Sequence, residues 1–343
     1  MHNPHATMDD IARECGLSKK TVSRVFCDST AVKKATRDKV MEVAKRLRYE
    51  VNILARNLNQ NQSGFIGVAT PLDAMLPGNY FAEIFQGFRR AIPDESGYIF
   101  ALFDTNSESF NDGEKLAKLY RQRRVDGLLV VALHTHDRFV GTLEQVHVPM
   151  VIVGEKSANR SVCSVFCDDE FGINQLCSYL YSLGHRRIAF VQGSNEYATC
   201  LRRKETFLQF MKSKGLEIPP GYIQPGDNSP RSGRAAAQIL LQTTPRPTAI
   251  MAGNDAMAIA IMETLRAHNV RVPEDISVTG FDDDTASRQC SPLLTTAHQP
   301  ISDMGEFGAR KLIYAINSKT LPRGNTMMEP SLIIRESTAS PRP

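Results

Sequence analysis

Several features that mark other classes of protein are missing from this 343-residue chain. No stretch approaches the ~18 consecutive apolar residues that a membrane-spanning helix needs. The N-terminus, Met-His-Asn-Pro-His, lacks the basic and apolar regions of a secretory signal peptide. Tryptophan is absent, and aromatic residues make up only 7% of the chain. These absences predict a soluble cytoplasmic protein with no membrane partner.

Paired cysteines and clustered histidines are missing as well. The seven cysteines are odd in number and form no CxxC pair, so neither a disulfide framework nor a zinc site is indicated. The eight histidines show no metal-ligand spacing. His134 and His136 straddle an expected loop and His185 precedes an expected strand, and we interpret all three as structural. The sequence therefore predicts no metal and no cofactor.

The sequence motifs of several large enzyme classes are also absent. The chain contains no GxSxG nucleophile elbow, no P-loop, no HExxH zinc motif and no GxGxxG dinucleotide motif. We therefore expect no catalytic residues and no enzymatic activity. The function has to be sought in what the sequence contains.

Positive charge is concentrated near the N-terminus, which the net charge of +4 conceals. Residues 1–62 hold 12 Lys and Arg against 7 Asp and Glu, whereas the rest of the chain holds 29 against 30. Surface helices often carry lysines, so by charge alone this region could equally be an ordinary solvent-exposed surface. The asymmetry still suggests an N-terminal module that binds nucleic acid, because Lys and Arg neutralise phosphates.

The segment 7–26 reads as two short helices joined by a glycine turn. Thr7 can cap the first helix while Asp10 reaches back to it, a capping-box pattern, and Gly16 ends that helix. Ser18 can cap the second helix. The outer face of the second helix is polar and basic, with Lys19, Lys20, Thr21, Ser23 and Arg24. A helix start of this composition suits the major groove of DNA, so we predict a helix-turn-helix.

A third helix and a linker complete this N-terminal module. Four apolar residues at helical spacing between residues 40 and 47 predict a helix that closes a three-helix core. Asn52 can then cap a further short helix at 53–58, followed by a polar linker at 59–64. A helix this short is marginal alone. We therefore expect it to need DNA, or its copy in a second chain, to become ordered.

From residue 65 onward, apolar runs alternate with amphipathic stretches. Continuous apolar strands separated by helices of 10–15 residues predict parallel sheets that are covered on both faces. About 280 residues is too many for one open sheet, so we expect two doubly wound α/β lobes that meet near Phe166 and bind a ligand between them. The expected strands are 65–70, 98–103, 127–132, 149–154, 162–165, 187–191, 248–252 and 276–280, and the expected helices include 81–92, 113–123, 170–183, 202–214 and 255–268.

Seven short motifs occur in a specific order along the chain. They are DIARECGLSKKTVSRV at 10–25, NILARNL at 52–58, VDGLL at 125–129, LGHRRI at 183–188, GND at 253–255, VPEDIS at 272–277 and GFDD at 280–283. Each motif alone is weak, but their order and spacing are specific. With them, essentially the whole chain resembles the lactose/galactose repressor (LacI/GalR) family of bacterial transcription regulators.

This resemblance implies a fold class and a domain organisation. The fold class is α/β: an all-α helix-turn-helix headpiece precedes a two-lobed, doubly wound core of periplasmic-binding-protein type. The headpiece is expected at 5–50, the hinge helix and linker at 51–63, and the effector-binding and dimerisation core at 64–340. Within the core, the first lobe is expected at 64–165 and 299–325, and the second at 166–298 and 326–340.

The resemblance also implies a function. We expect a cytoplasmic, nucleoid-associated repressor of carbohydrate-utilisation genes, which binds a pseudo-palindromic double-stranded DNA operator as a homodimer. Leu58 would wedge into the minor groove, and Lys19, Lys20 and Arg24 would read bases. The full set of expected DNA-binding residues is Thr7, Ser18, Lys19, Lys20, Thr21, Ser23, Arg24, Lys33, Asn52, Ala55, Arg56 and Leu58.

A small sugar or sugar derivative is the effector that the resemblance implies, bound between the lobes. A guanidinium, an amide and a carboxylate can satisfy hydroxyl groups, and without tryptophan any ring stacked on the sugar must be Phe or Tyr. Asp282 could instead lie in a solvated turn, and Phe81 could be ordinary core. Arg203 is preferred over the adjacent Arg202 because of its spacing to Phe207. The expected effector-binding residues are Phe81, Arg203, Met251, Asn254 and Asp282.

Three departures from the family pattern bear on these expectations. Val51 replaces a proline before the hinge, and Lys33 stands where a Ser or Thr usually caps the third helix, which suggests a phosphate contact. Met251 takes a position that is aromatic in members that sandwich purines. The alternatives are a solute-binding receptor and a regulator that responds to a non-sugar metabolite such as a purine. The sequence leaves open whether the effector releases or promotes DNA binding.

Overall fold

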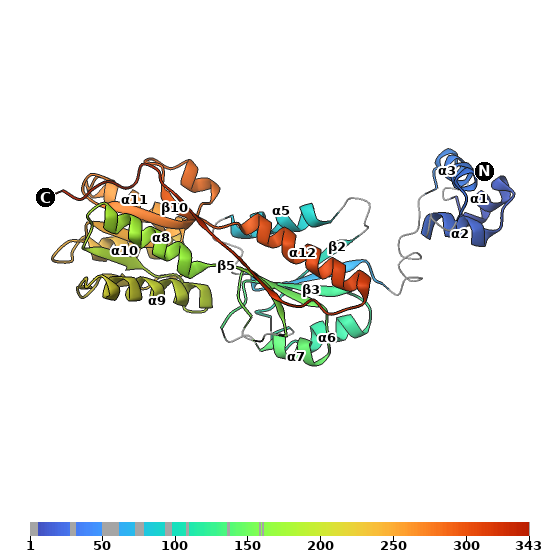
Figure 1. Ribbon diagram of the computed structural model, residues 1–343, viewed down its shortest axis with the longest axis horizontal. Coiled ribbons are helices and arrows are strands. Elements are labelled where there is room, and N and C mark those ends of the chain that lie inside the picture. The colour runs from blue at the N-terminus through green and yellow to red at the C-terminus, as the bar shows by residue number, and fades with distance from the viewer. Residues whose placement is uncertain are drawn as a thin grey trace. The chain divides into compact units, whose positions relative to one another are not determined.

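The computed structural model describes residues 6–27, 32–49, 62–72, 79–92, 98–107, 110–135, 138–157, 159 and 161–342. The chain divides into two compact units, Met1–Gly64 and Phe65–Pro343. The first unit is helical, and the second alternates strands with helices (Figure 1). The expected α/β fold class with an all-α N-terminal module is therefore confirmed.

Three helices pack together in the first unit, α1 (Met8–Cys15), α2 (Lys19–Cys27) and α3 (Lys34–Arg46). The capping box at α1 is formed as expected: the backbone N–H of Asp10 donates to Thr7 Oγ1 over 3.3 Å, and the N–H of Thr7 donates to the Asp10 carboxylate over 2.9 Å. Gly16 ends α1 with φ 63°, a conformation that glycine adopts without strain. The small core consists of Ile11, Ala12, Cys15, Val22, Val25, Val40, Val43 and Ala44.

Two six-stranded sheets form the second unit. The first has the order β11-β5-β4-β3-β1-β2 and is parallel throughout. The second has the order β12-β10-β9-β8-β6-β7 and is parallel except for β12, which is antiparallel to β10. The strands of the first sheet are β1 (Phe65–Thr70), β2 (Ile99–Asp104), β3 (Gly127–Val131), β4 (Met150–Val153), β5 (Cys163–Cys167) and β11 (Asn325–Met328). Those of the second are β6 (Ile188–Val191), β7 (Ile223–Gln224), β8 (Ala249–Ala252), β9 (Ser277–Asp282), β10 (Thr295–His298) and β12 (Ser331–Ile333).

Helices cover both faces of each sheet, so each lobe has three layers (Figure 1). In the first lobe, α5 and α12 lie on one face, and α6 and α7 on the other. In the second lobe, α10 and α11 lie on one face, and α8 and α9 on the other. The bounds of these helices are α5 (Tyr80–Ala91), α6 (Glu114–Arg121), α7 (Phe139–Gln145), α8 (Asp169–Ser182), α9 (Ala198–Ser213), α10 (Pro230–Leu240), α11 (Asp255–Ala267) and α12 (Ile301–Ser318).

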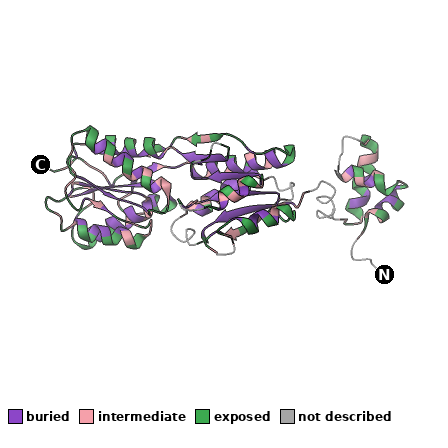
Figure 2. Cartoon of the chain, turned by 90° about the horizontal axis from the view of Figure 1, so that it is seen from below, coloured by how far each residue is buried: buried purple, intermediate pink, exposed green. Residues whose placement is uncertain are grey.

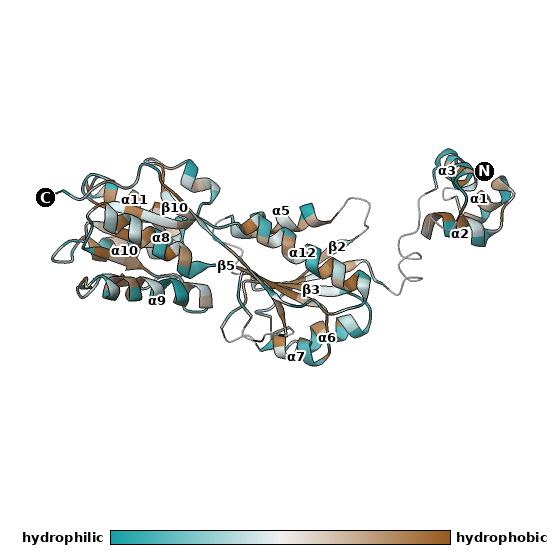
Figure 3. Cartoon of the chain, in the orientation of Figure 1, coloured by the Kyte–Doolittle hydropathy of each residue, from teal (hydrophilic) through white to brown (hydrophobic). Residues whose placement is uncertain are grey.

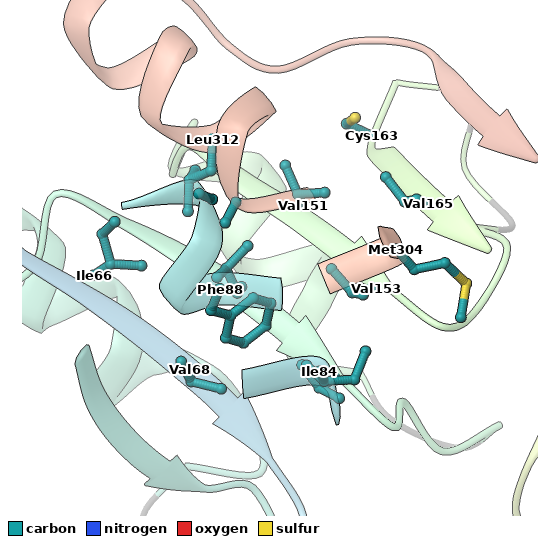
Figure 4. Packing of buried hydrophobic residues seen from close by; sticks show 14 of the residues in the cluster. Ile66, Val68, Ile84, Phe88, Val151, Val153, Cys163, Val165, Met304 and Leu312 are labelled. Atoms are coloured by element: carbon teal, nitrogen blue, oxygen red, sulfur yellow. The ribbon is translucent and has the colours of Figure 1, made fainter. Parts of the chain in front are cut away.

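The core of each lobe lies on the two faces of its sheet. Neighbouring residues of a strand point to opposite faces, so Leu129 packs in the cluster under α5 and α12 while Val130 packs in the cluster under α6 and α7. Figure 4 shows the first of these clusters, where Phe88 of α5 and Leu312 of α12 lie over strand residues. Buried strands run through the interior of both lobes (Figure 2), and the same strands are strongly apolar (Figure 3).

Three connections join the lobes, after β5, after β10 and after β11. The expected lobe boundaries at 165/166 and 325/326 fall inside strands, so both move a few residues toward the C-terminus. Phe166 and Cys167 continue β5 by pairing with Met327 and Met328 of β11. The expected strand ends at Val165, although both following residues are buried in the same sheet. β10 ends at His298, next to the boundary expected before residue 299.

Candidate DNA-binding surface and interlobe cavity

The exposed face of α2 carries the side chains that the sequence assigns to DNA. Lys19, Lys20 and Arg24 are exposed, and Thr21 and Ser23 are partly buried. Lys19 Nζ lies 2.7 Å from Asp9 Oδ2 of α1, so its charge is already partly satisfied within the headpiece. Within the part of the chain that the structure describes, neither Lys20 nor Arg24 forms an ion pair with a carboxylate. These two cations are therefore the better placed to reach a polyanion.

The hydroxyl groups at the helix starts are occupied by capping. Thr7 Oγ1 donates to Asp10 over 2.6 Å, and Ser18 Oγ accepts from the backbone N–H of Thr21 over 3.1 Å. Lys33 stands at the N-cap of α3 and is exposed, and its side chain makes no capping hydrogen bond. A contact of Thr7 or Ser18 with DNA would therefore involve groups that already have partners. The expected hinge residues Asn52, Ala55, Arg56 and Leu58 lie outside the described residues.

A cavity of about 260 Å³ opens between the two lobes of the core. Its walls come from the carboxyl ends of parallel strands and from the starts of α5, α9 and α11, the usual ligand position in doubly wound folds. Four of the five expected effector-binding residues line it, Phe81, Arg203, Asn254 and Asp282. The other lining residues are Asn79, Tyr80, Ala132, Leu133, Gly154, Glu155, Ser194, Glu196, Tyr197, Thr199, Cys200, Asp227, Asn228, Ala256, Asp284, Gln299 and Ile301.

Met251 does not line the cavity, which corrects the expectation. It lies within β8 with no exposed surface and packs in the core cluster between the sheet and α8 and α9. Residues inside a strand that is covered on both faces cannot reach the end of the sheet, whereas Asn254, just after β8, does. Met251 therefore gives no indication for or against a purine effector.

Arg203 is held rigidly in the cavity wall. Its Nε donates to Asp169 Oδ1 over 2.8 Å, and its Nη1 donates to the carbonyl oxygen of Gly253 over 2.8 Å. The guanidinium carbon lies 3.6 Å from the centre of the Phe281 ring. Burial alone would lower the pKa of Arg203, but the charges of Asp169 and Asp282 raise the pKa by more than burial lowers it. The guanidinium therefore stays charged. These three contacts fix its orientation.

Asp282 ends β9 in a strained conformation, with φ 124°, a region that residues with a side chain rarely adopt. Its Oδ1 accepts from Gln299 Nε2 over 3.0 Å and lies 3.6 Å from Arg203 Nη1. Burial raises the pKa of Asp282 to about 7, and the charge of Arg203 opposes this rise. A strained, partly neutralised carboxyl in a cavity is typical of a binding site rather than of a solvated turn.

Two other expected positions have structural contacts in addition to their place at the cavity. Asn254 is the N-cap of α11: its Oδ1 accepts from the N–H of Met257 over 3.0 Å, and its Nδ2 donates to the carbonyl oxygen of Asn228 over 3.0 Å. Phe81 belongs to the core cluster under α5 and also lines the cavity, so it is core and wall at once.

Contacts across the cavity join the two lobes. Glu155, just after β4 of the first lobe, lies 2.8 Å from Arg202 of α9 and accepts a hydrogen bond from the N–H of Thr199 over 3.1 Å. His134 Nε2 lies 3.1 Å from the hydroxyl of Tyr197, so this histidine takes part in the interface between lobes. Burial raises the pKa of Glu155, and Arg202 counteracts the rise.

Of the other two histidines that the sequence analysis considers, His185 is described and His136 is not. His185 is buried and bonds through Nδ1 with Thr248 and through Nε2 with Ser277 and the carbonyl oxygen of Ala339, the structural role expected of it. His136 lies outside the described residues. Among the residues that are described, no group of three or more His, Cys, Asp or Glu side chains is arranged to hold a metal ion. The helices described here are also too short or too polar to cross a membrane.

Several lining residues were not anticipated from the sequence. Tyr80 and Tyr197 supply rings and hydroxyls, Glu155 a carboxylate and Gln299 an amide. Tyr80 adjoins the expected Phe81, and Gln299 directly follows β10, so their positions at a helix start and a strand end were the available signals. Asp169, which holds Arg203 from behind the wall, had no signal of its own.

Comparisons with known proteins agree with this architecture. The sequence profile of bacterial regulatory proteins of the lacI family matches residues 7–52, and that of a periplasmic binding protein-like domain matches residues 177–338. The chain is 34% identical over 340 residues to the HTH-type transcriptional repressor PurR of Klebsiella pneumoniae (strain 342), and 97% of each chain is covered. It is 33% identical over 333 residues to the ribose operon repressor of Escherichia coli (strain K12), covering 97% of this chain and 99% of that one.

Solved structures show the same fold over nearly the whole length. The transcriptional regulator CelR in complex with cellobiose superposes with a TM-score of 0.72 and 30% identity, covering 97% of this chain and all of that one. The lac repressor dimer bound to operator and the anti-inducer ONPF superposes with a TM-score of 0.81 and 25% identity, covering 98% and 99%. The identity to the curated relatives, together with the headpiece and the two-lobed core, shows that this chain belongs to the LacI family and is a DNA-binding transcriptional regulator rather than an enzyme.

Proposed function

We propose that this regulator binds a pseudo-palindromic operator as a homodimer, and that a small sugar or sugar derivative bound between the lobes controls its affinity for that operator. The observation that carries the proposal is the cavity wall, where Arg203, Asp282 and Gln299 present fixed polar groups beside the rings of Tyr80 and Phe81. Such a wall can satisfy several hydroxyl groups while a ring covers an apolar sugar face.

The DNA-binding part of the proposal rests on the headpiece. One chain carries one helix-turn-helix, and a single recognition helix covers only one half-site. Lys20 and Arg24 are exposed and lie on the polar face of α2, and Lys33 is exposed at the start of α3. We assign base contacts to Lys20 and Arg24, with a smaller part for Lys19, whose charge is shared with Asp9. Lys33 would contact phosphate.

A second copy of the chain supplies the second half-site in this proposal. β2 is the edge strand of the first sheet, and it exposes Ile99 (56%) and Leu102 (45%), which supports a contact between chains. The lac repressor structure that this chain resembles is a dimer bound to operator. The hinge segment at 51–63 and its expected contacts through Asn52, Ala55, Arg56 and Leu58 belong to the same proposal.

The ligand part is supported by relatives of different specificity. One curated relative is the ribose operon repressor, and one structural relative is a complex with cellobiose. These two names support a sugar as one class of ligand for the present cavity. The proposed contacts are made by Phe81, Arg203, Asn254 and Asp282, together with Tyr80 and Gln299. A non-sugar effector such as a purine is the competing outcome.

Selection of genomic DNA fragments by the purified full-length protein, with and without candidate sugars, tests the proposal. We expect enrichment of one pseudo-palindromic site, occupied by two chains, with an occupancy that changes when the right sugar is added. Scrambling one half-site should then reduce affinity strongly. Binding of a single chain that is insensitive to this scrambling would refute the homodimer. A response to purines alone would refute the sugar.

A further inference from the structure

The charges that line the interlobe cavity are mostly of one sign. Among the lining residues that the structure describes, one is basic, Arg203, and five are acidic: Glu155, Glu196, Asp227, Asp282 and Asp284. This imbalance is local, because the core as a whole is nearly neutral in sequence. The cavity therefore differs from the surfaces around it in the sign of charge that it presents to a ligand.

The single lining cation is neutralised from behind. Asp169 is 2% exposed, and its Oδ1 accepts a hydrogen bond from Arg203 Nε over 2.8 Å. Oδ1 of Asp282 lies 3.6 Å from Arg203 Nη1. The carbonyl oxygen of Gly253 accepts from the same Nη1. A guanidinium with this set of partners can still donate to a ligand oxygen, but most of its positive charge is compensated by the protein.

The neighbouring cation, Arg202, is compensated in the same way. It lies 2.8 Å from Glu155 and 3.2 Å from Asp169. The result is an alternating row of five charges, which runs Glu155, Arg202, Asp169, Arg203, Asp282 and has a carboxylate at each end. Both terminal carboxylates line the cavity, whereas Arg202 and Asp169 do not.

At two of the three helix starts beside this cavity, α9 and α11, side chains of the protein already bond to the backbone N–H groups that often bind anions. The backbone N–H of Thr199 at the start of α9 donates to the Glu155 carboxylate over 3.1 Å. At the start of α11, the Asn254 side chain caps the helix and Asp255 is buried in its first turn. α5 carries Glu83 in its first turn. A ligand phosphate would have to compete with these carboxylates for the positive ends of the helices.

We propose that this cavity accepts an uncharged polyhydroxylated ligand and rejects the phosphorylated or carboxylated forms of the same sugar. The proposal rests on the proposed function and narrows its ligand class. Hydroxyl groups donate well to carboxylates, which are acceptors only, so an uncharged sugar uses the acidic lining. An anionic group on the ligand would find no cation whose charge is not already compensated by the protein. It would also lie close to the acidic lining residues, and repulsion between like charges is strong in a partly buried site.

Calorimetric titration of the full-length protein at pH 8 with matched pairs of ligands tests this proposal. The pairs are ribose and ribose 5-phosphate, glucose and glucose 6-phosphate, and cellobiose and cellobionate. For the pair whose neutral member binds, we expect the anionic member to bind at least about 100-fold more weakly. Glu196→Gln and Glu155→Gln each remove one lining charge and should reduce this ratio, by roughly tenfold for the better placed of the two.

Glu205→Gln is the matched control, because Glu205 is exposed on α9, bonds with Gln209 and does not line the cavity. It should leave the ratio unchanged. Tighter binding of a phosphorylated or carboxylated member would overturn the charge proposal while the sugar effector stands. An unchanged ratio in both lining variants would also overturn it, because the rejection would then be steric.

The outcomes separate this proposal from the function on which it rests. Hypoxanthine and adenine are included as uncharged ligands that are not polyols. If only these two bases bind, the proposal of a sugar effector is refuted, and so is the proposal that the ligand is polyhydroxylated. The proposal that the cavity rejects anionic ligands would still stand. If no probe binds, the assignment of the cavity as an effector site fails together with the ligand class.

Discussion

The carboxylate of Glu155 in the first lobe lies 2.8 Å from the guanidinium of Arg202 in the second. Glu155 follows a strand of the first lobe and Arg202 lies in a helix of the second, so the ion pair joins the two lobes. Glu155 is buried, and the side chain of Arg202 is 29% exposed. The pair is therefore more strongly shielded from solvent than an ordinary surface ion pair.

Removing either partner should open the lobes. In a double-mutant cycle with Glu155→Ala and Arg202→Ala, we expect a coupling free energy of about 1–3 kcal/mol for unfolding. The full-length variants would be unfolded in urea and followed by tyrosine fluorescence. The exposed pair of Arg234 and Glu263, 3.6 Å apart, serves as control and should couple by less than about 1 kcal/mol. Equal coupling in the two cycles would show that the Glu155 pair does not hold the lobes.

Loss of Arg203 should damage the fold as well as the cavity. Arg203→Ala leaves the buried carboxylate of Asp169 with Arg202 as its remaining cation, and breaking a buried pair in this way costs about 3–5 kcal/mol. A fall in Tm of about 10 °C is expected by differential scanning calorimetry. Arg234→Ala is the control, since it removes an exposed arginine. A similar, small change in both variants would contradict the structural part assigned to Arg203.

Asp282 should make stability depend on pH. Its folded pKa is raised to about 7, so between about pH 4 and pH 7 the folded protein binds a proton that the unfolded chain has released. The stability from this group is fully present below the unfolded pKa and is lost as the pH rises through 7. Relative to wild type, Asp282→Asn should therefore gain about 2 kcal/mol between pH 5 and pH 8. Thermal melts of both proteins at the two pH values measure this, and parallel curves would exclude it.

Cations of the headpiece should differ in how they affect DNA binding. Arg24→Ala or Lys20→Ala is expected to cost about 1–3 kcal/mol at the cognate operator and to relax the base preference there. Lys33→Ala should weaken cognate and random DNA alike and flatten the salt dependence, because a phosphate contact carries no sequence information. Fluorescence anisotropy over a range of salt concentrations separates the two patterns. Equal losses of Arg24→Ala on both DNAs would refute its role as a base-reading residue.

Local signals predicted local structure in this chain. The capping box of Thr7 and Asp10 and the left-handed Gly16 need only neighbours in sequence, and both are present. Asp282 was expected from the resemblance, and its place at the end of β9 is the usual ligand position at the edge of a parallel sheet. The fold class followed from the alternation of strands and helices, since the period of the apolar residues differs between them.

The parts that were missed depend on contacts distant in sequence. Asp169 matters only because the fold brings it to Arg203, and Glu155 only because the other lobe supplies Arg202. Met251 was misplaced because a position carried over from a resemblance does not say whether the residue lies inside a strand that is covered on both faces or at the strand's end. Helix α12 is not among the helices named from the sequence, and the glycines within it lower helical propensity. Its packing explains them.

Those glycines allow α12 and α5 to approach each other closely. A Cβ on Gly87 of α5 would lie 2.0 Å from the carbonyl oxygen of Ser302, and one on Gly305 would lie 2.5 Å from that of Ile84. Such backbone-to-backbone contact leaves no room for one helix to slide over the other without a clash. The two helices are thus packed backbone to backbone, and both begin at the cavity, where Tyr80 and Ile301 line the wall.

This pair connects the cavity with the strand that begins the core. The 18 residues of α12 span about 27 Å. At the far end, Leu312 and Ile316 pack in one cluster with Ile66 of β1, the second residue after the headpiece unit (Figure 4). Ile66 pairs with Gly127 of β3. A Cβ on Gly127 would lie 2.9 Å from the Leu312 side chain, so α12 packs closely against this strand as well. Under the proposed function, a ligand that contacts Tyr80 or Ile301 would therefore act on a close-packed helix pair whose far end packs against the first strand of the core.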